Sequence, residues 1–134
     1  MQNPPARSIV DKAALKRRIE RLNVSADIKL LLENLLEITH TVGSKIVQVG
    51  AKILESIFDF AKAYPNIALG VAAALVISFL INSIPLLGPA LSTILTPLLL
   101  ILGIGLGALN DLTDSSMKLS LDGIEAAFRG LSAQ

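Results

Sequence analysis

The sequence predicts an all-α protein, an integral membrane helical hairpin flanked by a long amphipathic N-terminal helix and a short amphipathic C-terminal helix. Two observations predict this fold class. No Asp, Glu, Lys or Arg occurs from Ala63 to Asn110. Because a membrane-spanning helix needs about 20 apolar residues, this segment is long enough for two. On both sides of it, apolar residues recur at the three- and four-residue spacing of amphipathic helices.

The chain begins with a polar lead and a basic helix. Residues 1–7 contain two prolines and no apolar period, so we expect them to be disordered. Ser8 and Asp11 have the spacing of a capping box, which predicts a helix over about 9–22. Such a helix carries a basic cluster, which favours an anionic membrane surface. Without interleaved aromatic residues, the cluster disfavours nucleic acid as a partner. Its members are Lys12, Lys16, Arg17, Arg18 and Arg21.

A longer amphipathic helix is predicted over about 26–62. Ser25 supplies a cap and Asp27 a carboxylate in the first turn. A helix of this length extends for about 50 Å. We expect neighbouring subunits to cover its apolar stripe, with Gly43 and Gly50 as bends, and a monomeric helix in the bilayer plane is the alternative. The stripe comprises Ile28, Leu31, Leu35, Ile38, Val42, Ile46, Val49, Ile53, Ile57 and Phe60.

The uncharged segment, residues 63–110, is predicted to form the membrane hairpin, with helices over about 65–82 and 90–109. Tyr64 suits the headgroup zone at its start. The segment Ser83-Ile84-Pro85-Leu86-Leu87-Gly88-Pro89 contains two prolines and a glycine, which interrupt a helix without adding charge. Pro97 is expected to kink the second helix.

Residues 111–134 are predicted to form an amphipathic tail helix. Apolar residues repeat by four and three from Met117 to Leu131. A helix this short needs a partner, and we expect it to pair with the helix before the membrane. Lys45, Lys52 and Lys62 precede the hairpin while its turn has no basic residue, so both termini are expected in the cytoplasm.

The sequence offers little to catalysis. The segment 63–110 has no ionisable acid or base that would serve a proton relay or ion-coupled carrier. The chain has no cysteine and one histidine, His40, while Glu33 and Glu37 lack partners that would complete a catalytic or metal-binding set. Gly103-Ile104-Gly105-Leu106-Gly107 lacks the context of a phosphate-binding loop. We therefore expect no enzyme activity, catalytic residue, cofactor, metal or small-molecule substrate.

Two short segments resemble known families. Ile81-Asn82-Ser83-Ile84-Pro85-Leu86-Leu87, followed by Pro89, is similar to the connection between the membrane helices of thylakoid curvature proteins. That resemblance implies a hairpin flanked by amphipathic helices that bends membranes by oligomerising. Gly107-Ala108-Leu109-Asn110-Asp111 is similar to the end of the hydrophobic hairpin of pore-forming colicins, which implies a permeabilising function.

These observations favour a non-enzymatic membrane protein that self-associates and scaffolds or curves the bilayer. The alternatives are a structural subunit of a larger membrane complex and a pore-forming protein of holin or toxin type. A pore needs a polar lining, whereas a wedge needs only apolar bulk. The polar candidates lie mainly toward the turn, which favours the wedge, and they are Ser78, Asn82, Ser92, Thr93 and Thr96.

Overall fold

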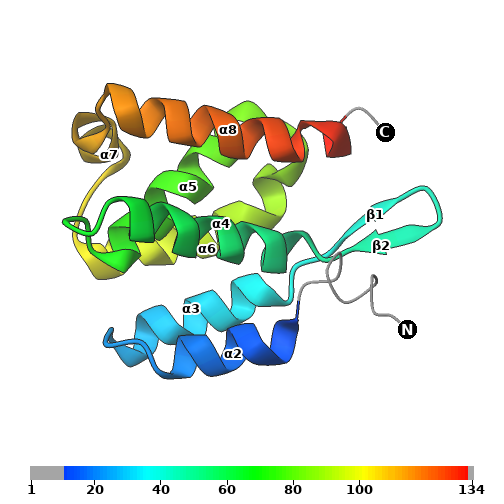
Figure 1. Ribbon diagram of the computed structural model, residues 1–134, viewed down its shortest axis with the longest axis horizontal. Coiled ribbons are helices and arrows are strands. Elements are labelled where there is room, and N and C mark those ends of the chain that lie inside the picture. Colours follow the sequence, from blue (N-terminus) through cyan, green and yellow to red (C-terminus); the bar gives the residue numbers. More distant parts are fainter. Residues whose placement is uncertain (1–10, 133–134) are drawn as a thin grey trace.

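The described part of this protein is a bundle of short helices packed around a central helix. The computed structural model describes residues 11–132, and 76% of it is helical, which confirms the all-α class. The predicted lead, residues 1–7, and the predicted capping residue Ser8 lie outside the described residues. The described elements are α2 (Lys12–Glu20), α3 (Ala26–Leu36), β1 (His40–Val42), β2 (Lys45–Val47), α4 (Val49–Ala63), α5 (Leu69–Ser83), η1 (Pro85–Leu87), α6 (Gly88–Leu102), α7 (Leu106–Leu112) and α8 (Ser115–Ser132) (Figure 1).

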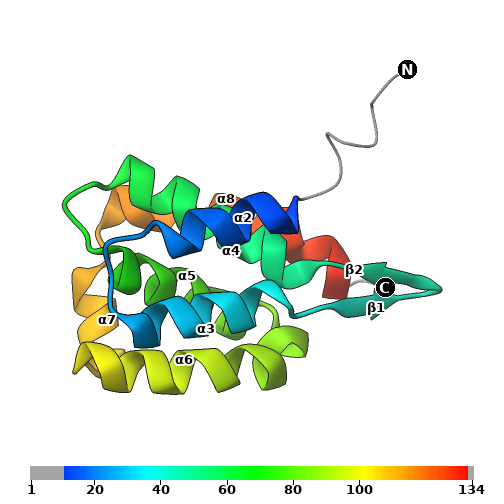
Figure 2. The same ribbon diagram turned by 90° about the horizontal axis from the view of Figure 1, so that it is seen from below.

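The central helix is α5. Eight of its fifteen residues are buried, and α4, α6 and α8 all pack against it (Figure 1). In the second view, α6 runs along one outer side of the molecule (Figure 2). The segment that we expected to be the first membrane helix, 65–82, is therefore the core of a helical bundle, because neighbouring helices supply its apolar surroundings. A pair of membrane spans is not seen in this arrangement.

The first described helix starts later than predicted. Asp11 caps α2, and its carboxylate accepts a hydrogen bond of 3.1 Å from the amide of Ala14. The helix ends at Glu20, so the described helix is shorter than the predicted range 9–22. The cap of α3 is as predicted, because the Ser25 hydroxyl accepts a hydrogen bond from the amide of Ile28 (3.2 Å).

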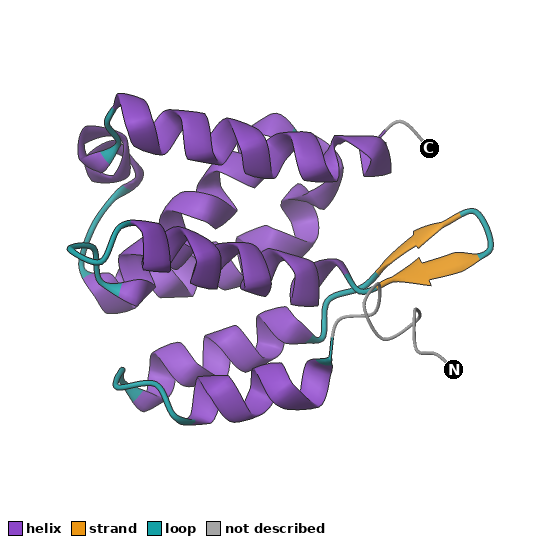
Figure 3. Ribbon diagram, in the orientation of Figure 1, coloured by secondary structure: helices purple, strands orange, loops and turns teal. Residues whose placement is uncertain are grey.

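The prediction of one helix over 26–62 is wrong. A β-hairpin separates α3 from α4 and projects from the helical body (Figure 3). Val42 pairs with Lys45, which leaves Gly43 and Ser44 as a two-residue turn. Gly43 has a φ of 63°, a conformation that glycine adopts without steric cost. Glycine at the first turn position is typical of type II′ hairpins, and the β-branched residues around it favour strands.

This turn folds the apolar stripe back on itself. Ile28, Leu31, Leu35, Ile53, Ile57 and Phe60 are all buried within one molecule. Neighbouring subunits are therefore not needed to cover this part of the stripe, contrary to our expectation from its length. Among the stripe residues whose side chains the structure describes, Ile46 in the hairpin is the exposed one, at 71%.

The second predicted membrane helix, 90–109, is also divided. α6 ends at Leu102, where Gly103 adopts a left-handed φ of 72°, a common way for a helix to end. Pro97 lies inside α6 as predicted. Pro97 has no N–H, so the carbonyl of Thr93 lacks its usual helical donor. The hydroxyl of Thr93 does not replace that donor, because it donates to the carbonyl of Ala90 (2.7 Å).

The backbones of α3 and α4 approach closely at Gly50. Its amide donates a hydrogen bond of 2.8 Å to the carbonyl of Ile38. A Cβ atom added at Gly50 would lie 1.7 Å from the carbonyl oxygen of Leu35. No side chain fits there unless the two helices separate.

We expect Gly50→Ala to lower the free energy of unfolding by at least about 2 kcal/mol, because overpacking against a backbone forces the helices apart. Denaturant unfolding followed by circular dichroism measures this change. The matched control is Gly123→Ala in α8, where an added Cβ meets no atom within 4 Å. That change is expected to be neutral or to stabilise the protein by up to about 1 kcal/mol. Equal midpoints for both variants would contradict the close approach.

Candidate functional site

One helix presents an uncharged surface to solvent. Within residues 11–132, Pro85–Leu102 is the one helical segment long and apolar enough to cross a membrane, yet only 28% of it is buried. Leu91, Ile94, Leu95 and Leu98 point into the bundle. The exposed residues lie on the opposite side at helical spacing and form what we call the outer face of α6: Leu86, Pro89, Ala90, Ser92, Thr93, Thr96, Leu100 and Ile101.

The polar groups of the outer face are largely satisfied within the helix. Ser92 donates to the carbonyl of Pro89 (3.3 Å) and Thr93 to that of Ala90 (2.7 Å). Hydroxyl groups that already have a partner cost less to remove from water. Leu100, near the end of the helix, is 78% exposed. The outer face is therefore chemically suited to an apolar medium.

The basic cluster lies elsewhere. In both views α3 separates α2 from α6 (Figures 1 and 2). The guanidinium of Arg18 lies 4.1 Å from the ring centroid of Phe58, and Lys12 pairs with Glu37 at 2.6 Å. Two of the five basic residues thus hold α2 on the bundle. The cluster is not adjacent to the outer face of α6.

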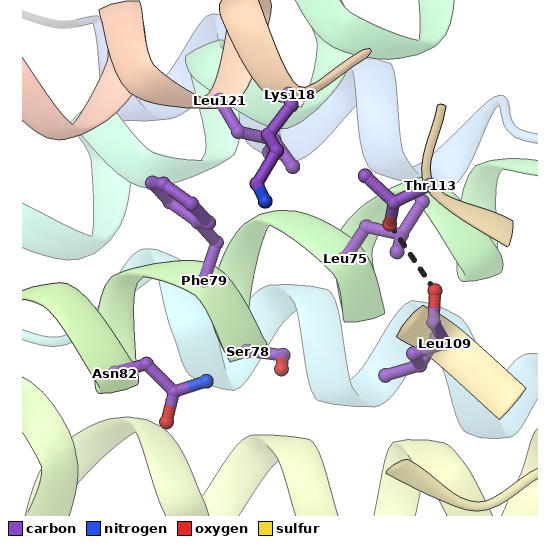
Figure 4. Close-up of a pocket in the computed structure, with 8 residues that line it drawn as sticks. All are labelled: Leu75, Ser78, Phe79, Asn82, Leu109, Thr113, Lys118 and Leu121. Carbon is purple, nitrogen blue, oxygen red and sulfur yellow. Dashed lines mark hydrogen bonds between the residues drawn. The ribbon is translucent and has the colours of Figure 1, made fainter. Parts of the chain in front are cut away.

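A pocket of about 230 Å³ opens between α5, α7 and α8. Lys118 reaches from α8 toward α5, between Phe79 and Leu75 (Figure 4). It is the one charged residue among the eight that line the pocket. The lining consists of Leu75, Ser78, Phe79 and Asn82 from α5, Leu109 from α7, Thr113 from the connection, and Lys118 and Leu121 from α8.

Three polar side chains of this pocket have no hydrogen bond or ion pair with another residue in the described part of the chain. They are Ser78, Asn82 and Lys118. The fourth, Thr113, donates its hydroxyl hydrogen to the carbonyl of Leu109 (3.2 Å). Ser78 and Asn82 lie one helical turn apart on the same face of α5. The pocket therefore has apolar walls and three polar side chains that no described residue engages, of which Asn82 and Lys118 are exposed to solvent.

The polar residues proposed for a pore lining fall on two surfaces. Ser78 and Asn82 line the pocket, while Ser92, Thr93 and Thr96 are exposed on α6 and do not line it. The bundle does not bring the five together. As arranged here, they do not form one continuous polar path.

Tyr64 connects the tail to the bundle. Its hydroxyl is 3.0 Å from the hydroxyl of Ser116 and 3.1 Å from that of Ser120. The tail stripe is buried at Met117, Leu121 and Phe128, and α8 packs against α5. The tail thus covers the central helix, in addition to its polar contact with the residue that follows α4.

The remaining candidates do not form a site. His40 lies in the projecting hairpin, and Glu37 pairs with Lys12. Among residues 11–132, no group of three or more His, Cys, Asp or Glu side chains could hold a metal ion. No protein-family model, curated protein or solved structure matches the chain. The outer face of α6 and the pocket are therefore the two candidate functional sites.

Proposed function

We propose that this chain is a non-enzymatic membrane protein that inserts the outer face of α6 into one leaflet and scaffolds or curves the bilayer as a wedge. One observation carries the proposal: Pro85–Leu102 is apolar, yet it is mostly unburied. An uncharged, largely apolar face in water marks a surface that another apolar medium covers. By contrast, α5 is equally free of charge and is accounted for by its place in the core.

Helix lengths favour an in-plane wedge. The fifteen residues of α5 extend for about 22 Å, and the eighteen residues of Pro85–Leu102 for about 27 Å. The hydrocarbon core is about 30 Å thick, so α5 is short for a span. A helix lying in the interface adds area to one leaflet only, which bends the bilayer.

The finer proposal is a second state in which α4 and α8 separate from α5, and α5 then joins α6 in the bilayer as a hairpin. In a hairpin, as in a wedge, neither end of the chain crosses the membrane. Both termini then stay on one side. The lysines before the segment favour the cytoplasmic side.

We expect Leu100→Glu to weaken binding to phosphatidylcholine vesicles at least about tenfold. A charge at the bilayer centre costs roughly 2.5–3.5 kcal/mol, and a tenfold change needs only about 1.4 kcal/mol. Vesicle co-flotation measures bound protein. Neutral vesicles exclude attraction by the basic cluster.

The matched control is Leu119→Glu on α8. Leu119 is 73% exposed and Leu100 is 78% exposed, so both changes remove a similarly exposed leucine and add the same charge. The control is expected to bind vesicles as the unaltered protein does. Equal binding by both variants, or no binding by the unaltered protein, would overturn the assignment of α6.

Vesicle shape separates a wedge from a pore. With dye-loaded vesicles, we expect tubulated or shrunken vesicles that retain their dye, because a wedge bends the bilayer without opening a polar path. Fluorescence leakage and electron microscopy are read on the same sample. Rapid leakage without a change of shape would favour the pore-forming alternative and contradict the wedge.

A second candidate, assembly into a larger membrane complex, uses the same outer face against another copy or a partner chain. The observation that favours it is that the stripe residues of α3 and α4 are covered internally, which leaves the outer face of α6 as a surface still open to a partner. In nanodiscs we expect a native mass of more than one chain. A single-chain mass at micromolar concentration would contradict self-association, and the lipid wedge would then be the remaining candidate.

A further inference from the structure

We propose that the pocket between α5, α7 and α8 is a binding site for a monocarboxylate with a short aliphatic chain. The carboxylate would lie against Lys118, and the chain against the apolar walls. This site is separate from the membrane-binding surface, because none of its lining residues belongs to the outer face of α6.

The polar groups favour an anion. Lys118 brings three N–H donors and no acceptor, and the hydroxyl of Ser78 and amide of Asn82 each add donors. No acidic residue lines the pocket, and no described residue pairs with Lys118. A small number of polar groups among apolar walls is typical of a ligand site.

The charge favours a carboxylate over a phosphate. A phosphate monoester carries nearly two negative charges at neutral pH, about −1.5 to −2, whereas the pocket lining has one cation. A carboxylate carries one charge and two acceptor oxygens. Either oxygen can accept a hydrogen bond from the Lys118 ammonium.

The volume limits the chain. About 230 Å³ is less than the roughly 300–1,000 Å³ of typical ligand pockets, so the pocket suits a short chain. The chain would contact the apolar part of the wall, formed by Leu75, Phe79, Leu109 and Leu121. The pocket opens to solvent, so a longer chain can extend from its mouth.

Titration calorimetry of the full chain with hexanoate tests the site. We expect saturable binding with one hexanoate per chain, and at least tenfold weaker binding by Lys118→Met. The matched control is Lys52→Met, which removes an exposed lysine of α4 and leaves binding unchanged. Circular dichroism establishes that each variant is folded.

Probes used with the unaltered protein keep the test independent of any variant. Hexanol and hexylamine share the chain but lack the carboxylate, so neither is expected to bind. Dodecanoate distinguishes the source of the ligand: tighter binding than hexanoate indicates a fatty acid from lipid, and equal binding indicates a soluble metabolite.

Three outcomes overturn the proposal: no saturable binding of hexanoate, hexanoate binding that Lys118→Met leaves unchanged, or binding of inorganic phosphate in preference to hexanoate. None of them bears on vesicle binding through α6. Conversely, if Leu100→Glu does not weaken vesicle binding, the proposal about the pocket is unaffected.

Discussion

The absence of charge from α5 is the constraint on which the bundle depends. A helix with so few polar side chains must be shielded from water on several sides. The helices α4, α6 and α8 each pack an apolar face against it. The helices α2 and α3 extend the same core through Leu15, Ile19 and the leucines of α3. In α2, α3, α4 and α8, charged residues occupy the remaining face. The exception is α6, which is covered by apolar contacts on one side and carries no charge on the other.

The helical class and several helix ends could be predicted from the sequence because they depend on local chemistry. Ser25 caps its helix through its own hydroxyl, and the tail stripe is buried at Met117, Leu121 and Phe128. The prediction of one long helix over 26–62 was wrong, because the three- and four-residue spacing of apolar residues continued through the segment that forms the hairpin. Glycine and serine between β-branched residues were a turn signal in the sequence, and the apolar period outweighed it.

The candidate sites could be predicted only where their residues are contiguous. The outer face belongs to one helix, so its lack of charge was visible in the sequence, but periodicity cannot tell whether a core or a bilayer covers an apolar helix. The same limit applies to α5, whose apolar sequence suits both a bilayer and the core that it forms in the bundle. The pocket could not be predicted, because Ser78 and Lys118 line the same pocket only after α8 packs against α5. The way in which these two helices align cannot be read from either segment of sequence.

The projecting hairpin has a consequence for how this protein can diversify. The bond between the amide of Gly50 and the carbonyl of Ile38 closes its base, so the packing of α3 against α4 does not depend on what lies beyond that bond. Insertions at exposed loop tips are tolerated because they disturb little buried backbone. The Gly43-Ser44 tip is thus the point at which evolution can lengthen the hairpin or replace it with another loop while the bundle stays unchanged.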